Sequence, residues 1–146
     1  MEEFDVNWIA LIVAAIIPLV TGFIWYHPKV LGTAWMKETG MTEAKAKSMN
    51  PGKTYGLAVV FAFIAGFFLW AQVMVGGGPG EPHGVEPYMT FKHGAFHGVL
   101  VAVMVVLPVF ATNALFEMKS AKYVLINVGY WILTFALMGG LLNAWV

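Results

Sequence analysis

The sequence contains four long stretches without a charged residue, and these restrict the chain to a small set of folds. A helix that crosses a lipid bilayer needs about twenty consecutive, mostly apolar residues. Each uncharged stretch reaches that length, and together they cover residues 6–26, 54–80, 93–116 and 123–146. The sequence therefore predicts one membrane domain over residues 1–146, with spans near 6–27, 54–75, 93–116 and 123–145.

The spans are predicted to be helices. Lipid offers backbone groups no hydrogen-bonding partner, so a spanning segment must be a helix or part of a closed barrel. Four strands are too few to close a membrane barrel, and apolar runs such as 57–71 lack the alternation of a barrel strand. Only 11% of the residues are charged, against about a quarter in soluble domains. The predicted fold class is an all-α integral membrane protein with four transmembrane helices.

The eight lysines are distributed unevenly between the two sides of this layout. Seven of them lie in the first and third loops, and Lys92 alone lies on the side of the second loop. An excess of lysine in short loops marks the cytoplasmic side of a membrane. We therefore expect a multi-pass protein of the inner (cytoplasmic) membrane. Both termini are expected outside, which is the periplasm in a Gram-negative cell.

Two connecting segments differ in composition. In the first loop, about 27–53, Pro28 is placed to begin a short surface helix, Gly40 to end it, and Thr42 to cap a second turn. These short helices are expected to lie at the membrane interface. The second loop, 76–87, is rich in glycine and proline, which disfavours regular structure. It is expected to be either mobile or held by a partner.

The two halves of the chain resemble each other weakly. A shift of ninety residues aligns Pro18 of the first span with Pro108 of the third, and a shift of sixty-eight aligns Tyr55 with Tyr123. Such an alignment would make the fold two parallel-repeat hairpins. Each proline removes a backbone hydrogen bond inside its helix, so Pro18 and Pro108 are predicted kink positions. They mark either simple bends or a cavity or hinge where the bends meet.

Three polar residues lie near the turn between the third and fourth spans. Asn113 and Glu117 are four residues apart and share a helix face, and Asn127 returns to a similar depth on the next helix. A buried polar group in a membrane helix is costly unless it has a partner. We therefore expect the two amides to bond across the hairpin, with Glu117 nearer the surface. Such a cluster is either a scaffold element or a functional site.

Two histidines open the third span. His93 and His97 are four residues apart, so both imidazoles lie on one helix face, as in many metal sites. His83, Glu81 and Glu86 precede them and would complete a site. The histidines do not form a His-Glu-x-x-His motif, and an interfacial pair also suits water, headgroups or a pore lining. We therefore expect no bound metal and no cofactor.

Several short motifs combine polar and aromatic residues in a fixed order. The runs Thr112-Asn113-Ala114-Leu115-Phe116-Glu117 and Leu125-Ile126-Asn127-Val128-Gly129-Tyr130 resemble the signature of a bacterial family known as domain of unknown function 1761. The segments Trp25-Tyr26-His27-Pro28 and Ala34-Trp35-Met36-Lys37 are similar to its first half. The resemblance covers nearly the whole chain and implies a small integral membrane protein. It implies no established activity, so no catalytic role is carried over.

No feature of the sequence points to an enzyme. The chain has no cysteine and no phosphate-binding loop, and its net charge of zero gives no reason to expect a nucleic-acid partner. Small residues such as Ala62 and Gly66 suit helix contacts, so we expect a homo-oligomer or a larger membrane complex in the bilayer. The favoured hypothesis is a non-catalytic accessory or assembly subunit. The alternatives are a small oligomeric channel or transporter-like protein for a neutral or weakly polar solute, and a metal-binding protein that uses His93 and His97.

Overall fold

The computed structural model describes residues 6–75, 80 and 83–145, and over these residues the protein is built from helices. Four of them are long and apolar enough to cross a membrane, namely Trp8–Trp25, Pro51–Met74, Phe91–Phe116 and Ala121–Ala144. No strand occurs in this part of the chain. The predicted all-α class with four membrane-length helices is therefore confirmed.

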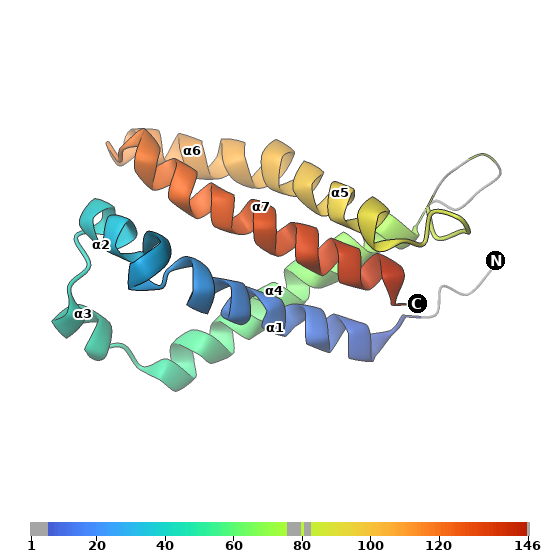
Figure 1. Cartoon of the computed structure of the whole chain (residues 1–146), viewed down its shortest axis with the longest axis horizontal. Helices are drawn as coiled ribbons and strands as arrows, with labels where there is room; N and C mark the ends of the chain where they lie inside the picture. The colour runs from blue at the N-terminus through green and yellow to red at the C-terminus, as the bar shows by residue number, and fades with distance from the viewer. Residues whose placement is uncertain (1–5, 76–79, 81–82, 146) are drawn as a thin grey trace.

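Short helices fill the first loop (Figure 1). A π-helical turn divides the third span. In chain order the elements are α1 (Trp8–Trp25), η1 (Pro28–Gly32), α2 (Thr33–Thr39), α3 (Glu43–Lys47), α4 (Pro51–Met74), α5 (Phe91–Val101), η2 (Ala102–Val106), α6 (Leu107–Phe116) and α7 (Ala121–Ala144). The end of the bundle that holds Asn7, residues 83–90 and Trp145 is termed the terminal end. The opposite end carries seven of the eight lysines and is termed the lysine-rich end.

The long helices begin at side chains that cap them. The Asn7 side chain accepts a hydrogen bond from the backbone N–H of Ala10 at 3.0 Å. A cap of this kind satisfies one of the backbone N–H groups that the first turn of a helix leaves free. The same arrangement occurs at the starts of α4, α5 and α7, where the capping residues are Asn50, Thr90 and Ser120.

The predicted helix start, helix end and cap in the first loop are confirmed, and the placement of these helices at the membrane interface stays a prediction. Pro28 is the first residue of η1, and Gly40 ends α2 with a φ of 67°, in the left-handed region that favours glycine. The Thr42 hydroxyl caps α3 by accepting from the backbone N–H of Lys45 at 3.2 Å. Turn chemistry of this kind depends on neighbouring residues only, which is why the sequence reveals it.

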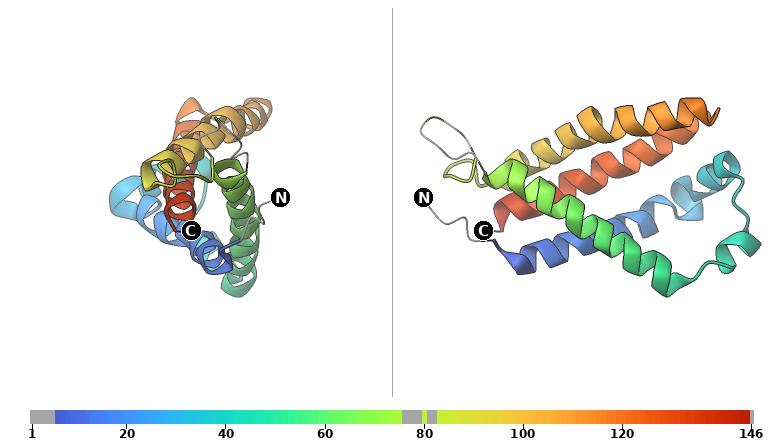
Figure 2. Two further views of the ribbon diagram at one scale, coloured as in Figure 1. Left: turned by 90° about the vertical axis from the view of Figure 1, so that its right-hand side faces the viewer. Right: turned by 180° about the vertical axis from the view of Figure 1, so that it is seen from behind.

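Helix α7 lies at the centre of the bundle, with α1 and α5 packed against different sides of it (Figures 1 and 2). In the most apolar stretch of α7, 44% of the residues are buried, whereas the value for Phe91–Phe116 is 11%. The third span therefore lies at the edge of the bundle. Its contact with α7 is close, because a Cβ at Gly98 would overlap the backbone carbonyl of Phe135.

The apolar core lies toward the terminal end. Buried side chains from three helices pack together there, among them Leu11 of α1, Leu69 of α4 and Met138 of α7. Residues 51–57 at the start of α4 are exposed by contrast, and Figure 2 shows α4 diverging from α6 and α7 toward the lysine-rich end. The terminal end is thus the more closely packed part of the molecule.

The two predicted kink prolines have different surroundings. Pro18 lies inside α1, which is continuous, and its backbone carbonyl accepts a hydrogen bond from the Tyr130 hydroxyl at 2.7 Å. Pro108 follows the π-helical turn η2, in which the N–H of Leu107 bonds to the carbonyl of Ala102. Both prolines and π-helical turns bend helices. The two positions are not equivalent, and the suggested duplication stays a prediction.

Candidate metal-binding site

The loop before α5 folds back onto the end of α4. The backbone N–H of Gly84 donates to the carbonyl of Val73 at 3.1 Å. Gly84 has a φ of +65°, and a Cβ at this position would overlap the carbonyl of Met74. The position therefore requires glycine, which adopts a positive φ without steric cost. This contact fixes the preceding residue, His83, beside α5.

Asn143 of α7 holds the other end of the same loop. Its side chain is fully buried, and its amide nitrogen donates to the carbonyls of Tyr88 and Thr90, each at 2.8 Å. The Thr90 hydroxyl in turn caps α5 by accepting from the N–H of His93 at 3.3 Å. Residues 83–90 are thus held by the chain itself. Residues 76–79 and 81–82 of the predicted loop lie outside the described residues.

Three histidines meet at the terminal end. His93 and His97 lie together on α5, with ring centroids 4.7 Å apart. His83 reaches them from the loop, and its Nε2 atom lies 3.2 Å from the Nε2 atom of His97. One ring nitrogen from each of the three histidines lies within 4.8 Å of the other two. Of the three loop residues that the sequence offers to complete a site with His93 and His97, the structure brings His83 to them.

The Nε2 atom of His93 is buried and has no hydrogen-bonding partner in the protein. Buried polar atoms without a partner are uncommon in folded proteins, and each one calls for an explanation. A hydrogen bond between His83 and His97 satisfies those two rings when one carries the proton and the other does not. It leaves His93 unsatisfied, whereas a cation between the three rings would bind all of them.

The surroundings of the cluster are aromatic. The ring of Tyr88 lies 5.6 Å from that of His93, and the ring of Phe96 lies 5.9 Å from that of His97. Glu86 is exposed and does not belong to the cluster, and Glu81 lies outside the described residues. The donors that converge are therefore three imidazoles. Imidazole suits zinc, copper, iron and nickel, whereas magnesium and calcium prefer carboxylate and carbonyl oxygens.

The predicted amide pair between Asn113 and Asn127 is wrong. The side-chain oxygen of Asn127 accepts from the Tyr26 hydroxyl at 2.9 Å, and its nitrogen donates to the backbone carbonyl of Tyr123 at 2.8 Å. Asn113 and Glu117 are both exposed. Tyr26 reaches Asn127 from α1 and satisfies it within the bundle, so Asn127 needs no partner from α6. The three predicted polar residues do not form one site.

The structure contains a set of hydrogen bonds between α1 and α7 that the sequence analysis does not predict. The hydroxyl oxygens of Thr21 and Thr134 are 2.8 Å apart, and the indole N–H of Trp25 donates to the carbonyl of Ile126 at 2.9 Å. Polar groups inside a membrane bundle need such partners. We interpret this set as a scaffold that ties α1 to α7.

The fold and the histidine cluster define a class, namely a four-helix membrane protein with a candidate metal site near one end. The family model described as protein of unknown function (DUF1761) matches residues 9–143. The chain therefore belongs to the DUF1761 family, as its short motifs indicate. Comparisons with curated proteins and with solved structures gave no match.

Proposed function

We propose that this protein binds one transition-metal ion of the zinc type at its terminal end, with His83, His93 and His97 as ligands. The observation that carries the proposal is the convergence of three imidazole nitrogens within 4.8 Å of one another. The buried, unpartnered Nε2 atom of His93 supports it. We revise the expectation of no bound metal because the loop places His83 beside the two histidines of α5.

The spacing of the ligand atoms fits tetrahedral coordination. Zinc–imidazole bonds of about 2.0–2.1 Å place two ligand nitrogens about 3.3 Å apart at tetrahedral angles. The Nε2 atoms of His83 and His97 are 3.2 Å apart. The ligand nitrogen of His93 lies within 4.8 Å of those of the other two histidines, and metal binding would draw it closer to them.

Three protein ligands leave one coordination position for a ligand from outside. Zinc sites with three protein ligands and an open position bind water or a substrate, whereas structural sites are closed by a fourth protein ligand. All three histidines are only partly buried, so the cluster lies near the surface of the protein. We therefore place the function in exchangeable metal binding at the membrane surface.

The accessory-subunit and channel hypotheses have less specific structural support than metal binding. An accessory or assembly subunit can carry a metal site, and that role stays a prediction, as does self-association. The channel hypothesis gains nothing from the groove between α1 and α7, because apolar side chains line it and provide no polar path for a solute. The metal-binding hypothesis rests on a specific geometry and is the one we favour.

Metal titration of the purified protein tests the proposal. After treatment with a chelator, the wild-type protein in detergent should bind about one equivalent of zinc in calorimetry and in elemental analysis. His97→Ala should weaken binding by more than about 100-fold, since even partners that only orient a ligand contribute 10–100-fold.

His27→Ala is the matched control for this titration. His27 is the remaining histidine and lies at the lysine-rich end, where its Nδ1 accepts a hydrogen bond from the N–H of Lys29. This variant should bind zinc as the wild type does. Binding far below one equivalent in the wild type, or equal loss in both variants, would contradict the proposal.

We propose further that the histidine cluster faces the outside of the cell. The lysine distribution supports this orientation, because the seven lysines of the first and third loops favour the cytoplasmic side. The chain has no cysteine, so Lys92→Cys and Lys45→Cys each introduce a unique thiol on an exposed position. In intact cells an impermeant thiol reagent should label Lys92→Cys and should label Lys45→Cys only after permeabilisation. The reverse pattern would invert the orientation.

A further inference from the structure

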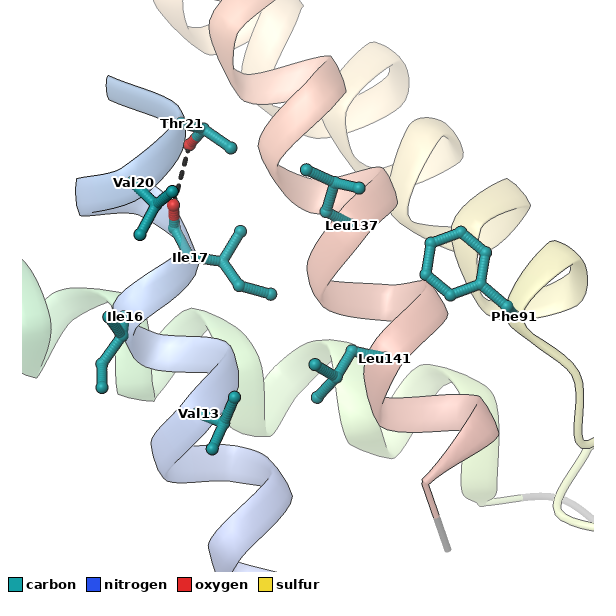
Figure 3. Close-up of a pocket in the computed structure, with 8 residues that line it drawn as sticks. All are labelled: Val13, Ile16, Ile17, Val20, Thr21, Phe91, Leu137 and Leu141. Carbon is teal, nitrogen blue, oxygen red and sulfur yellow. Dashed lines mark hydrogen bonds between the residues drawn. The ribbon is translucent and has the colours of Figure 1, made fainter. Parts of the chain in front are cut away.

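A groove of about 370 Å³ runs between α1 and α7 (Figure 3). One wall consists of residues of α1 from Val13 to Thr21, and the other consists of Leu137 and Leu141 of α7. Phe91, the first residue of α5, completes the lining, and its ring lies against Gly140 of α7. The groove is of the size that small-molecule sites occupy, which is about 300–1,000 Å³.

Hydrogen bonds tie α1 to α7 at one end of the groove and beyond its other end. Toward the lysine-rich end the hydroxyls of Thr21 and Thr134 meet at 2.8 Å. Toward the terminal end the side-chain amide of Asn7 donates to the carbonyl of Trp145 at 3.2 Å. The two helices are therefore held at a fixed separation, and the groove between these ties is a built feature of the helix pair.

The lining excludes water as the occupant. The exposed surface of the groove is apolar, and its one polar side chain, Thr21, is engaged with Thr134 and with the carbonyl of Ile17. A bound water needs two to four polar partners, and apolar cavities stay dry and accept apolar ligands. Since α1 and α7 are both membrane-length helices, hydrocarbon is the apolar material that surrounds them.

The length of the groove matches one leaflet. Val13 and Thr21 are eight residues apart, which corresponds to a rise of about 12 Å along a helix. Half of a hydrocarbon core of about 30 Å is about 15 Å, close to the same length. Along α1 the groove extends from Val13, inside the first half of the helix, to Thr21, just past its middle. Leu137 and Leu141 lie in the half of α7 nearer the terminal end, so the groove lies mainly toward that end.

We propose that this groove binds one acyl chain of a phospholipid from the leaflet at the terminal end. The chain lies between α1 and α7 and replaces the side-chain contact that the two helices lack there. Recognition is by shape and by apolar contact. This site is independent of the histidine cluster, because none of the three histidines lines it.

Photolabelling in vesicles tests the acyl-chain site. The full chain is reconstituted in phosphatidylcholine and phosphatidylglycerol vesicles with a trace of phospholipid that carries a diazirine midway along one acyl chain. After irradiation, label should be enriched several-fold at residues 13–20 of α1 over Phe61 and Ile64 of α4, which are exposed apolar residues outside the groove. Even labelling of all these positions would mean ordinary boundary lipid and would overturn the proposal.

Two tryptophan variants sharpen the test. Leu137→Trp fills the groove and should reduce labelling of residues 13–20 at least about threefold. Leu133→Trp, one turn away on α7 and outside the lining, should leave it unchanged. Where Leu137→Trp fails to fold, Val13→Phe takes its place with the same expected loss. Unchanged labelling in the folded groove variant, or labelling by a diazirine fatty acid but not by the phospholipid, would contradict a phospholipid chain in this groove.

Discussion

Gly98→Val should lower the free energy of unfolding by about 3 kcal/mol or more, since overpacking costs about 1–3 kcal/mol and the clash here is with backbone. A Cβ at Gly98 would overlap the carbonyl of Phe135 in α7. A flexible side chain yields to a new methyl group, but a helix backbone cannot. Helix α5 would therefore separate from α7, along a contact that also includes Gly94 and Gly139. Thermal or detergent-induced unfolding of the purified protein, followed by circular dichroism, measures the loss.

Gly56→Val is the matched control for this substitution. Gly56 lies in α4, another membrane-length helix, and a Cβ there would meet no atom within 4 Å. Surface substitutions away from special features usually change stability by less than about 0.5 kcal/mol. Equal stability of the two variants would show that α5 and α7 are not packed as closely as the structure has them.

The spans and short loop helices could be predicted because they depend on local sequence. Length without charge marks a span whatever lies beside it, and Pro28, Gly40 and Thr42 act on their own helix ends. Glycines at 94 and 98 can likewise be recognised as contact residues. The helix against which these glycines pack could not be predicted in the same way, because several small residues occur on every span.

The wrong prediction of an amide pair shows that the depth of a residue along its helix does not determine which neighbouring helix its side chain faces. Asn113 and Asn127 are at similar distances from the turn, but a helix rotates its side chains by about 100° per residue. Rotation decides which helix a side chain faces, and it depends on packing across the whole bundle. Asn127 faces α1 and receives the Tyr26 hydroxyl, while Asn113 is exposed. Four-residue spacing within one helix carries no information about Tyr26.

The histidine cluster depends partly on local sequence and partly on contacts between residues that are distant in the chain. His93 and His97 share a face because of their spacing, which the sequence states directly. The position of His83 depends on the bond from Gly84 to Val73 and on the hold of Asn143 on the loop. These contacts join residues that are far apart in the chain. The sequence names His83 only as one of three loop residues that would complete the site, and the structure is needed to show that it is the histidine that does so.

Zinc at a free concentration of 100 times its dissociation constant should stabilise the wild-type protein by about 2.7 kcal/mol. His83 lies in the loop, and His93 and His97 lie on α5, so the ion would join the loop to the helix. An ion that binds only the folded state raises the free energy of unfolding by mass action. His83→Ala should lose this stabilisation, and His27→Ala should keep it.

Gly84→Ala tests whether zinc binding depends on the position of His83, because the variant displaces this residue without removing it. The variant keeps all three histidines, but its Cβ would overlap the carbonyl of Met74 at a positive φ and displace the loop. Zinc affinity should fall about 10–100-fold, the range for residues that orient a metal ligand. Metal binding requires neutral imidazoles, so the stabilisation should also decline as the pH is lowered and return when it is raised. Full zinc stabilisation in Gly84→Ala or in His83→Ala would show that the loop histidine is not a ligand.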